Sequence, residues 1–457
     1  MTSLPLVVDF EHGLLSCNLG VEATFALAKV KPLHALGTVL RFASGSGSAV
    51  AFVERHQHID ATGLPYNEQV LALADAARKS GRRVYLVSSR YREYATAAAE
   101  HLSLFDAVLT PDTLDELGQF DFIGHTRSGI WTRARNLVLV NPAMSQESAA
   151  RARGNLTEVI RSRYHPLMDW LRALRLHQWL KNTLVLVPLF ASHRVLSPGL
   201  LIDALIAFLL FGCCASSVYL LNDLFDLRDD RHHPTKRSRP FASGRLSPAS
   251  GLGVLLALLV ASFAGSLMLL PREFTVALGV YYAVTLAYSL GLKRVMMLDV
   301  VVLAGLYTLR MVAGTLAFGG ELTFWMLAFS VFMFMSLALA KRYGELHDAR
   351  LRSEIDNPRG RGYLTSDLEM ISAMGIASGL LAVMVLAFYI QDQATMVLYS
   401  HPKIIWFACP VLLYWVGRTW MLTHRGQMHD DPVVFAITDR VSILTGLVFG
   451  LIFVLAS

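Results

Sequence analysis

The feature that most limits how this sequence can fold is a series of long apolar stretches between residue 183 and the end of the chain. Each is close to the roughly 20 residues that a helix needs to cross a bilayer. Hydrophobic residues make up 54% of the sequence and charged residues only 17%, which is too few to cover so much apolar sequence with a solvated surface. Nine spans are expected, at about 183–197, 199–221, 251–270, 274–291, 298–318, 324–342, 368–390, 403–422 and 434–456.

The loops between these stretches predict the orientation of the helices. Most of the Lys and Arg residues of this half fall at 223–245, 293–294, 341–361 and 424–425, whereas the alternate loops hold few. Since positively charged loops stay in the cytoplasm, these loops and the N-terminal region are expected there. With nine spans the C-terminus lies outside, and the bacterial inner membrane is the expected location. The first residues lack the basic segment of a signal peptide.

Residues 1–142 have a different pattern, in which short β-rich runs alternate with helical ones. Such alternation predicts an α/β domain with a parallel sheet. Strands are expected at Leu4–Asp9, Arg83–Ser88, Ala107–Leu109, Asp121–Ile123 and Leu137–Val140, with helices at Asn67–Ser80 and Glu93–Leu102. Residues 143–180 are interpreted as a basic linker that ends in an amphipathic helix on the membrane surface. The transmembrane domain then occupies residues 181–457.

An Asp-rich segment at the end of the second span is the strongest chemical signal. Asp223, Asp226 and Asp230 are spaced at i, i+3 and i+7, which puts three carboxylates on one helical face. Because neighbouring carboxylates repel one another and are costly near a bilayer, they suggest a site for Mg²⁺, which prefers oxygen ligands. The bases that follow are suited to phosphate oxygens; they are Lys236, Arg237 and Arg239.

The net charge of +6 does not indicate a nucleic-acid partner. The basic residues fall in short clusters between apolar runs, and a basic stripe interleaved with aromatic residues is missing.

The sequence NDLFDLRDDRHHPTKRSRP, from Asn222 to Pro240, resembles the first Asp-rich motif of the UbiA superfamily of intramembrane prenyltransferases. The upstream RLHQWLKN, from Arg175 to Asn182, is also similar to that family. The resemblance covers about residues 165–457 and implies nine helices around a central cavity, with catalysis and Mg²⁺ binding at Asp223, Asp226 and Asp230.

Three further segments resemble the polyprenyl-phosphate phosphoribosyltransferases within that superfamily. They are KRYGEL at Lys341–Leu346, YSLGLKRVMMLD at Tyr288–Asp299 and HDDPVVFAITDR at His429–Arg440. The resemblance implies transfer of 5-phosphoribose from phosphoribosyl diphosphate to a polyprenyl phosphate, and leaves homo-oligomerisation open. It also implies phosphate contacts for Lys181, Lys341 and Arg342 and a positioning role for Tyr343. The full set of candidate substrate-binding residues is Gln178, Lys181, Asn182, Asn222, Lys236, Arg237, Arg239, Lys293, Arg310, Lys341, Arg342 and Tyr343.

Two other functions are weighed against this one. An aromatic prenyltransferase would carry a second Asp-rich cluster after the sixth span, where Asp348, Glu354 and Asp356 are scattered instead. A transport or lipid-binding protein would carry inverted repeats or broken helices.

Two charged residues in the spans have a less specific interpretation. Within the fifth span, Arg310 is interpreted equally well as a substrate contact or as half of a structural pair. In the last span, Asp439 is expected to pair with Arg440.

The N-terminal region resembles the haloacid-dehalogenase (HAD) phosphatase fold, with a damaged active site. Asp9 matches the nucleophile, but Glu11 replaces the second Asp of the family's DxDGT motif. Ser88 matches the phosphate-binding hydroxyl, and His125 and Ser128 stand where the family has acids. The resemblance implies a pseudo-phosphatase, although an active phosphatase acting on the product remains the alternative.

Overall fold

The computed structural model describes residues 4–30, 60–126, 129–161, 166–191, 197–233, 235–320, 322–351, 362–428 and 431–457. Two compact units share the chain. The first combines Met1–Leu174 with Tyr219–Leu255, and the second combines Arg175–Val218 with Leu256–Ser457. Two long helices, α9 (Pro198–Phe225) and α11 (Pro248–Leu269), therefore contribute residues to both units.

The first unit contains a six-stranded sheet in the order β3-β2-β1-β4-β5-β6, with every neighbouring pair parallel. All five predicted strands are confirmed within two residues at each end. The strands are β1 (Leu6–Asp9), β2 (Val84–Val87), β3 (Ala107–Leu109), β4 (Asp121–Gly124), β5 (Leu137–Val140) and β6 (Leu156–Ile160). In such a sheet the carboxyl ends of the central strands form the usual crevice for ligands.

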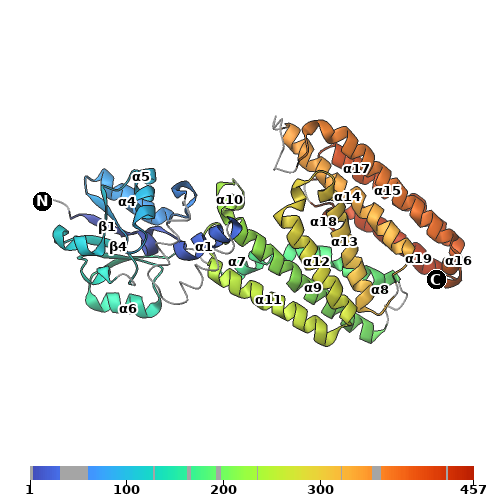
Figure 1. The fold of residues 1–457 in the computed structure, drawn as a ribbon, viewed down its shortest axis with the longest axis horizontal. Helices are drawn as coiled ribbons and strands as arrows, with labels where there is room; N and C mark the ends of the chain where they lie inside the picture. Colours follow the sequence, from blue (N-terminus) through green and yellow to red (C-terminus); the bar gives the residue numbers. More distant parts are fainter. Residues whose placement is uncertain are drawn as a thin grey trace. The chain divides into compact units, whose positions relative to one another are not determined.

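Helices cover both faces of the sheet, as a parallel sheet requires. Figure 1 shows α4 (Glu68–Lys79) and α5 (Arg92–Leu102) on one side and α6 (Met144–Arg153) on the other. The predicted helices at 67–80 and 93–102 are α4 and α5. Also in this unit are α1 (Leu19–Val30), α7 (Pro166–Ala173) and α10 (Leu227–His232).

The structure differs from the predicted linker at residues 143–160. There α6 and β6 continue the α/β alternation, and β6 pairs with β5 at the edge of the sheet. The sequence pattern did not predict this strand because its central residues are exposed and it lacks a long apolar run. The predicted amphipathic helix corresponds to α7, whose Leu167 is 74% exposed.

The second unit is helical. Its entry segment is a 3₁₀ helix, η6 (Leu176–Leu186), that leads into the short α8 (Val187–Ala191). The helices that follow α9 and α11 are α12 (Arg272–Leu290), α13 (Leu298–Ala317), α14 (Phe324–Leu351), α15 (Leu368–Gln391), α16 (Gln393–Leu398), α17 (Ala408–His424), α18 (Pro432–Thr438) and α19 (Arg440–Ala456).

Seven helices in the described part of the chain are long and apolar enough to cross a membrane. A further pair, α18 and α19, passes the same test but is bent by 77°, which makes eight if the pair is one span. The predicted span at 183–197 corresponds in part to η6 and α8, which are too short to be counted. A multi-pass helical membrane fold is therefore confirmed, whereas the count of nine stays a prediction.

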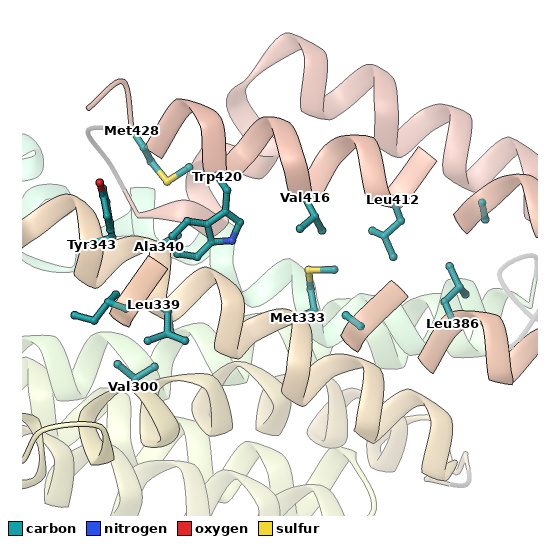
Figure 2. Close-up of a cluster of buried hydrophobic side chains, with 14 of the residues drawn as sticks. Val300, Met333, Leu339, Ala340, Tyr343, Leu386, Leu412, Val416, Trp420 and Met428 are labelled. Atoms are coloured by element: carbon teal, nitrogen blue, oxygen red, sulfur yellow. The ribbon is translucent and has the colours of Figure 1, made fainter. Parts of the chain in front are cut away.

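The largest apolar core of the second unit joins α13, α14, α15 and α17. Figure 2 shows Trp420 of α17 between Met428 and Ala340, with Tyr343 nearby on α14. The indole nitrogen of Trp420 donates a 3.0 Å hydrogen bond to Ser336 Oγ, which in turn donates to Gly375 O at 2.7 Å. These hydrogen bonds hold α14, the helix that carries the KRYGEL segment, against α15 and α17.

Gly314 allows α13 to approach the entry segment closely. A Cβ atom at this position would lie 1.9 Å from Val185 O, so any side chain must push the two segments apart. Gly305 on the same helix has open space around it among the described residues. The close approach brings the residues of η6 next to those of α13.

We expect Gly314→Ala to destabilise the protein because the methyl group would collide with backbone, at a cost of about 1–3 kcal/mol for an overpacked site. Gly305→Ala is the matched control and should leave stability nearly unchanged. Thermal unfolding of the two variants in the same detergent measures the difference. Equal unfolding temperatures would contradict the close approach of α13 and η6.

Candidate functional site

The Asp-rich segment lies where α9 ends. The helix stops at Phe225, and Asp226 has non-helical backbone angles before α10 begins at Leu227. Backbone hydrogen bonds of 2.8 Å from Asp226 N to Asn222 O and from Asp230 N to Asp226 O continue across the break. The Asp-rich segment is therefore divided between two helices, α9 and α10.

Asp223 and Asp230 are directed toward the same cation. The two residues are 4% and 2% exposed. The Nη1 atom of Arg239 lies 3.2 Å from Asp223 Oδ1 and 2.6 Å from Asp230 Oδ2. Lys236 Nζ lies 3.7 Å from Asp230 Oδ1. Two of the three predicted basic residues of this loop, Lys236 and Arg239, thus meet the predicted acids, with Arg239 between two carboxylates.

Asp226 is half-buried beside this pair, as is Asn222, while Arg237 is exposed. A group of three or more acidic, His or Cys side chains positioned to hold a metal is not found in the described residues. Two carboxylates that already share one cation nevertheless form a donor set that fits a divalent ion. Asp223 and Asp230 are therefore the residues of the predicted trio whose geometry suits metal binding best.

A second charged cluster lies in the other unit, around Asp431. Lys181 Nζ is 2.7 Å and Lys341 Nζ 3.0 Å from the same Oδ2 atom of Asp431. Tyr307 donates its hydroxyl to this carboxylate at 3.0 Å. Three elements that are distant in sequence, η6, α13 and α14, thus meet at the N-terminus of α18, which Asp431 caps through a 3.1 Å bond from Val433 N.

The charged groups of this cluster shift one another's pKa values. Burial lowers the pKa of Lys181 to about 8, although the nearby Asp431 carboxylate acts in the opposite direction. Burial alone would raise the pKa of Asp431, but the ammonium groups of Lys341 and Lys181 outweigh it and hold that pKa below its usual range. Two ammonium groups around one ionised carboxylate leave the cluster with a net positive charge at neutral pH.

Sequence reasoning missed the contacts of Asp431. The residue was part of the HDDPVVFAITDR segment, but the sequence offered no reason to join it to lysines 250 and 90 positions away. A usable signal was present in the dipeptide Asp431-Pro432, because Asp before Pro at the first helical turn is a helix start with an anionic cap. The preceding His429 and Asp430 lie outside the described residues.

Arg310 is buried in the middle of α13. It donates to three neutral oxygens: Asn182 Oδ1 at 3.2 Å, Tyr281 Oη at 3.0 Å and Leu306 O at 2.8 Å. Its guanidinium carbon also lies 4.9 Å from the centre of the Tyr281 ring, a favourable position for a cation. The structure thus brings together two predicted residues, Asn182 and Arg310, through a network that fixes both side chains.

Arg342 has internal partners. It is 1% exposed, and its Nη2 atom lies 2.7 Å from Asp299 Oδ2 while Nη1 contacts Glu345. Tyr363 donates to the other oxygen of Asp299 at 2.5 Å. To contact phosphate as predicted, the Arg342 side chain would have to leave the carboxylates of Asp299 and Glu345. The geometry therefore favours a structural ion pair for Arg342. The cause of the difference is burial, which the sequence does not reveal.

The remaining predicted residues lie apart from these contacts. Tyr343 is buried and its hydroxyl is 2.9 Å from His424 Nδ1. Gln178 of η6 and Lys293 of the turn after α12 are half-buried. The carboxylate of Asp439 pairs with Arg418 at 2.6 Å, so the expected pair with Arg440 is wrong. Glu354, Asp356 and Ser128 lie outside the described residues.

At the carboxyl edge of the sheet, Glu11 fills an anion cradle at the start of α5. Its Oε1 atom accepts hydrogen bonds from Ser88 Oγ (3.0 Å), Ser89 N (3.1 Å), Arg90 N (2.8 Å) and Tyr91 N (3.4 Å). Its Oε2 atom accepts from Ser89 Oγ at 2.7 Å. The hydroxyl that the HAD resemblance assigns to a phosphate is therefore bonded to the protein's own carboxylate.

Comparison with known proteins gives a consistent result for the membrane half. The model of the UbiA prenyltransferase family matches residues 183–444. The uncharacterised protein y4nM of Sinorhizobium fredii is 34% identical over 99% of this chain and 91% of its own. The nodulation protein NoeC of Azorhizobium caulinodans is 36% identical over 64% of this chain and 94% of its own. Decaprenyl-phosphate phosphoribosyltransferase of Mycobacterium tuberculosis is 31% identical over 59% of this chain and 88% of its own.

We expect Glu11→Ala to open the cradle at residues 88–91 to inorganic phosphate. In the variant, millimolar phosphate should raise the unfolding temperature of the sheet domain by a few degrees, because a ligand that binds only the folded state stabilises it. The parent protein, whose cradle is filled, should not respond. A triple variant that also carries Ser88→Ala and Ser89→Ala is the control. An equal response of parent and Glu11→Ala proteins would contradict this account of Glu11.

Proposed function

Because the chain belongs to the UbiA prenyltransferase family and is therefore a membrane-embedded transferase, we propose that it transfers 5-phosphoribose from phosphoribosyl diphosphate to a polyprenyl phosphate. The relative from Mycobacterium tuberculosis is named for this reaction with a decaprenyl phosphate. In the reaction, an oxygen of the lipid phosphate attacks the anomeric carbon of the ribose. The bond from that carbon to the diphosphate breaks, and diphosphate leaves.

The observation that carries the proposal is the convergence of Lys181 and Lys341 on one carboxylate oxygen of Asp431. A prenyl diphosphate donor has a single charged end, whereas phosphoribosyl diphosphate has a second one, its 5-phosphate. We assign the 5-phosphate to Lys181 and Lys341, with Tyr307 as a further hydrogen-bond donor. A phosphate dianion carries more charge than the carboxylate that now holds the two ammonium groups, so it competes well for them.

The diphosphate is assigned to the Asp-rich segment. Asp223 and Asp230 would hold Mg²⁺ in place of the Arg239 guanidinium, and the ion would neutralise the charge of the leaving diphosphate. Arg239 and Lys236 are then free to contact diphosphate oxygens. Asp226 and Asn222 are proposed as additional oxygen ligands or as groups that orient the first two. The acceptor needs no general base because a phosphate dianion is already nucleophilic.

The proposal includes a location. The basic loops favour a protein of the bacterial inner membrane with its N-terminal domain and active site in the cytoplasm. The apolar helices would give the polyprenyl chain access from the bilayer. The N-terminal domain is proposed to be a pseudo-phosphatase of HAD type, since Glu11 fills the cradle beside Asp9.

The donor test uses purified protein in detergent with Mg²⁺, a short polyprenyl phosphate and radiolabelled phosphoribosyl diphosphate. We expect label in the lipid phase that disappears when EDTA removes the divalent ion. Failure with this donor, together with product from a prenyl diphosphate and 4-hydroxybenzoate, would assign the protein to the aromatic branch and contradict the role given to the lysines.

Asp223→Asn, Asp226→Asn and Asp230→Asn are expected to reduce transfer by roughly a hundredfold or more, as loss of a group that stabilises charge in the transition state does. Asp229→Asn is the matched control because this acid is exposed and precedes Asp230 directly. Initial rates and the yield of folded protein would be measured together. Retained activity in Asp223→Asn would refute the metal assignment.

The KM for phosphoribosyl diphosphate is expected to rise as the pH increases through about 8, the pKa of Lys181. Above this value Lys181 loses its proton and no longer attracts an anion. Arginine keeps its charge to much higher pH, so Lys181→Arg should remove this dependence while retaining activity. Steady-state kinetics from neutral to alkaline pH provide the measurement. An unchanged alkaline rise of KM in Lys181→Arg would assign it to another group.

A further inference from the structure

The loop that carries the Asp-rich segment is anchored to the N-terminal part of its own unit. Arg231, the residue after Asp230, forms two hydrogen bonds to Glu22 of α1, from Nη1 at 2.7 Å and from Nη2 at 2.5 Å. Its Nε atom donates to Ala242 O at 3.0 Å. Both charged side chains are less than 10% exposed. One guanidinium thus connects α1, α10 and the later part of the loop.

A second contact involves His232. Its Nε2 atom lies 3.2 Å from both Asp60 Oδ2 and Thr62 Oγ1, and its Nδ1 atom is 2.9 Å from Arg228 O. A Cβ at Gly63 would lie 2.6 Å from the imidazole ring, so the histidine packs directly against the backbone there. The turn at residues 60–63 therefore fits α10 closely.

A third group of contacts fixes the end of the loop. A Cβ at Gly244, whose φ is +75°, would lie 2.9 Å from Ser16 O. The side chain of Arg245 donates from Nε to Asp169 of α7 at 3.0 Å and from Nη2 to Ser238 O at 2.6 Å. Both ends of the segment 231–245 are thus held by residues that precede 175.

We propose that the N-terminal domain acts as a clamp that positions the Asp-rich loop, with the Glu22–Arg231 pair as its central contact. The loop supplies both Asp230 and Arg239, which lie 2.6 Å apart. Holding α10 at Arg231 fixes the direction of the preceding Asp230. Holding Ala242, Gly244 and Arg245 fixes the chain that returns from Arg239. In this role the domain needs no phosphatase chemistry, and Glu22 is a positioning residue.

Because the Glu22–Arg231 pair is buried, the loop should be sensitive to the loss of either charge. Two charges removed from water are stable only as a pair, and removal of one leaves the other without compensation. Loss of Glu22 should therefore free Arg231 and with it α10, even though the sheet itself is untouched. The consequence for activity rests on the proposed function, whereas the consequence for the loop does not.

The test compares Glu22→Ala with the control Glu147→Ala in full-length protein. Glu147 of α6 likewise forms ion pairs, with Arg151 at 2.6 Å and with Arg161, but at the domain surface. Hydrogen exchange of the amides of residues 227–246 should accelerate by at least roughly tenfold in Glu22→Ala, as expected for local opening. It should stay unchanged in Glu147→Ala. Equal exchange in the two variants would overturn the clamp.

The second measurement is turnover. Glu22→Ala should lower kcat by about tenfold and raise the Mg²⁺ concentration for half-maximal rate, with little change in KM for the lipid phosphate, because misplacement of a reacting group reduces rate more than binding. Faster exchange with unchanged kcat would refute the positioning role. If the parent protein fails to transfer phosphoribose, the proposed function is wrong, and the exchange measurement still decides the clamp.

Glu22→Gln serves where Glu22→Ala does not fold. The amide keeps the shape and one hydrogen-bond acceptor but removes the charge, so it should give a smaller acceleration of exchange over the same residues. Exchange at parental rates in this variant and in Arg231→Gln would overturn the proposal.

Discussion

The need to neutralise charge away from water governs the arrangement of this protein. A charged group near the centre of a bilayer or in a packed interior is tolerated only with a partner. Arg342 and Asp299 satisfy this need for each other between α14 and α13. Arg239 compensates the charges of two carboxylates, Asp223 and Asp230. Asp431 compensates those of two lysines, Lys181 and Lys341. Helix packing and site geometry are therefore consequences of the same requirement, since each pair fixes two or three helices.

Features of short range were predicted well from the sequence. Local β-rich runs predicted five strands of the N-terminal sheet. The spacing of the aspartates, and the basic residues that come after them, predicted the Asp-rich site. The multi-pass membrane fold follows from apolar stretches alone. Edge strand β6 was missed because its middle residues, Thr157 and Glu158, face solvent and break the apolar pattern.

Features of long range could not be predicted in the same way. Asp431 meets Lys181 and Lys341 only because η6, α14 and α18 pack together, and a single sequence carries no record of that packing. Arg342 was assigned to phosphate since the sequence does not tell which arginine of a basic segment is buried against an acid. Glu11 was read as a damaged catalytic residue, whereas in the structure it accepts five hydrogen bonds from the turn that follows β2.

The carboxylate shared by Lys181 and Lys341 has a consequence for which anions can enter the site. The Asp431 carboxylate already pairs with both lysines, so under the proposed function an incoming anion would have to displace it. Chloride brings no more charge than the carboxylate it would displace, and it lacks the high local concentration that a covalent link provides. A phosphate dianion brings an additional charge and more acceptor oxygens. Under the proposed function, the cluster would therefore discriminate against monovalent anions such as chloride and favour a multiply charged substrate.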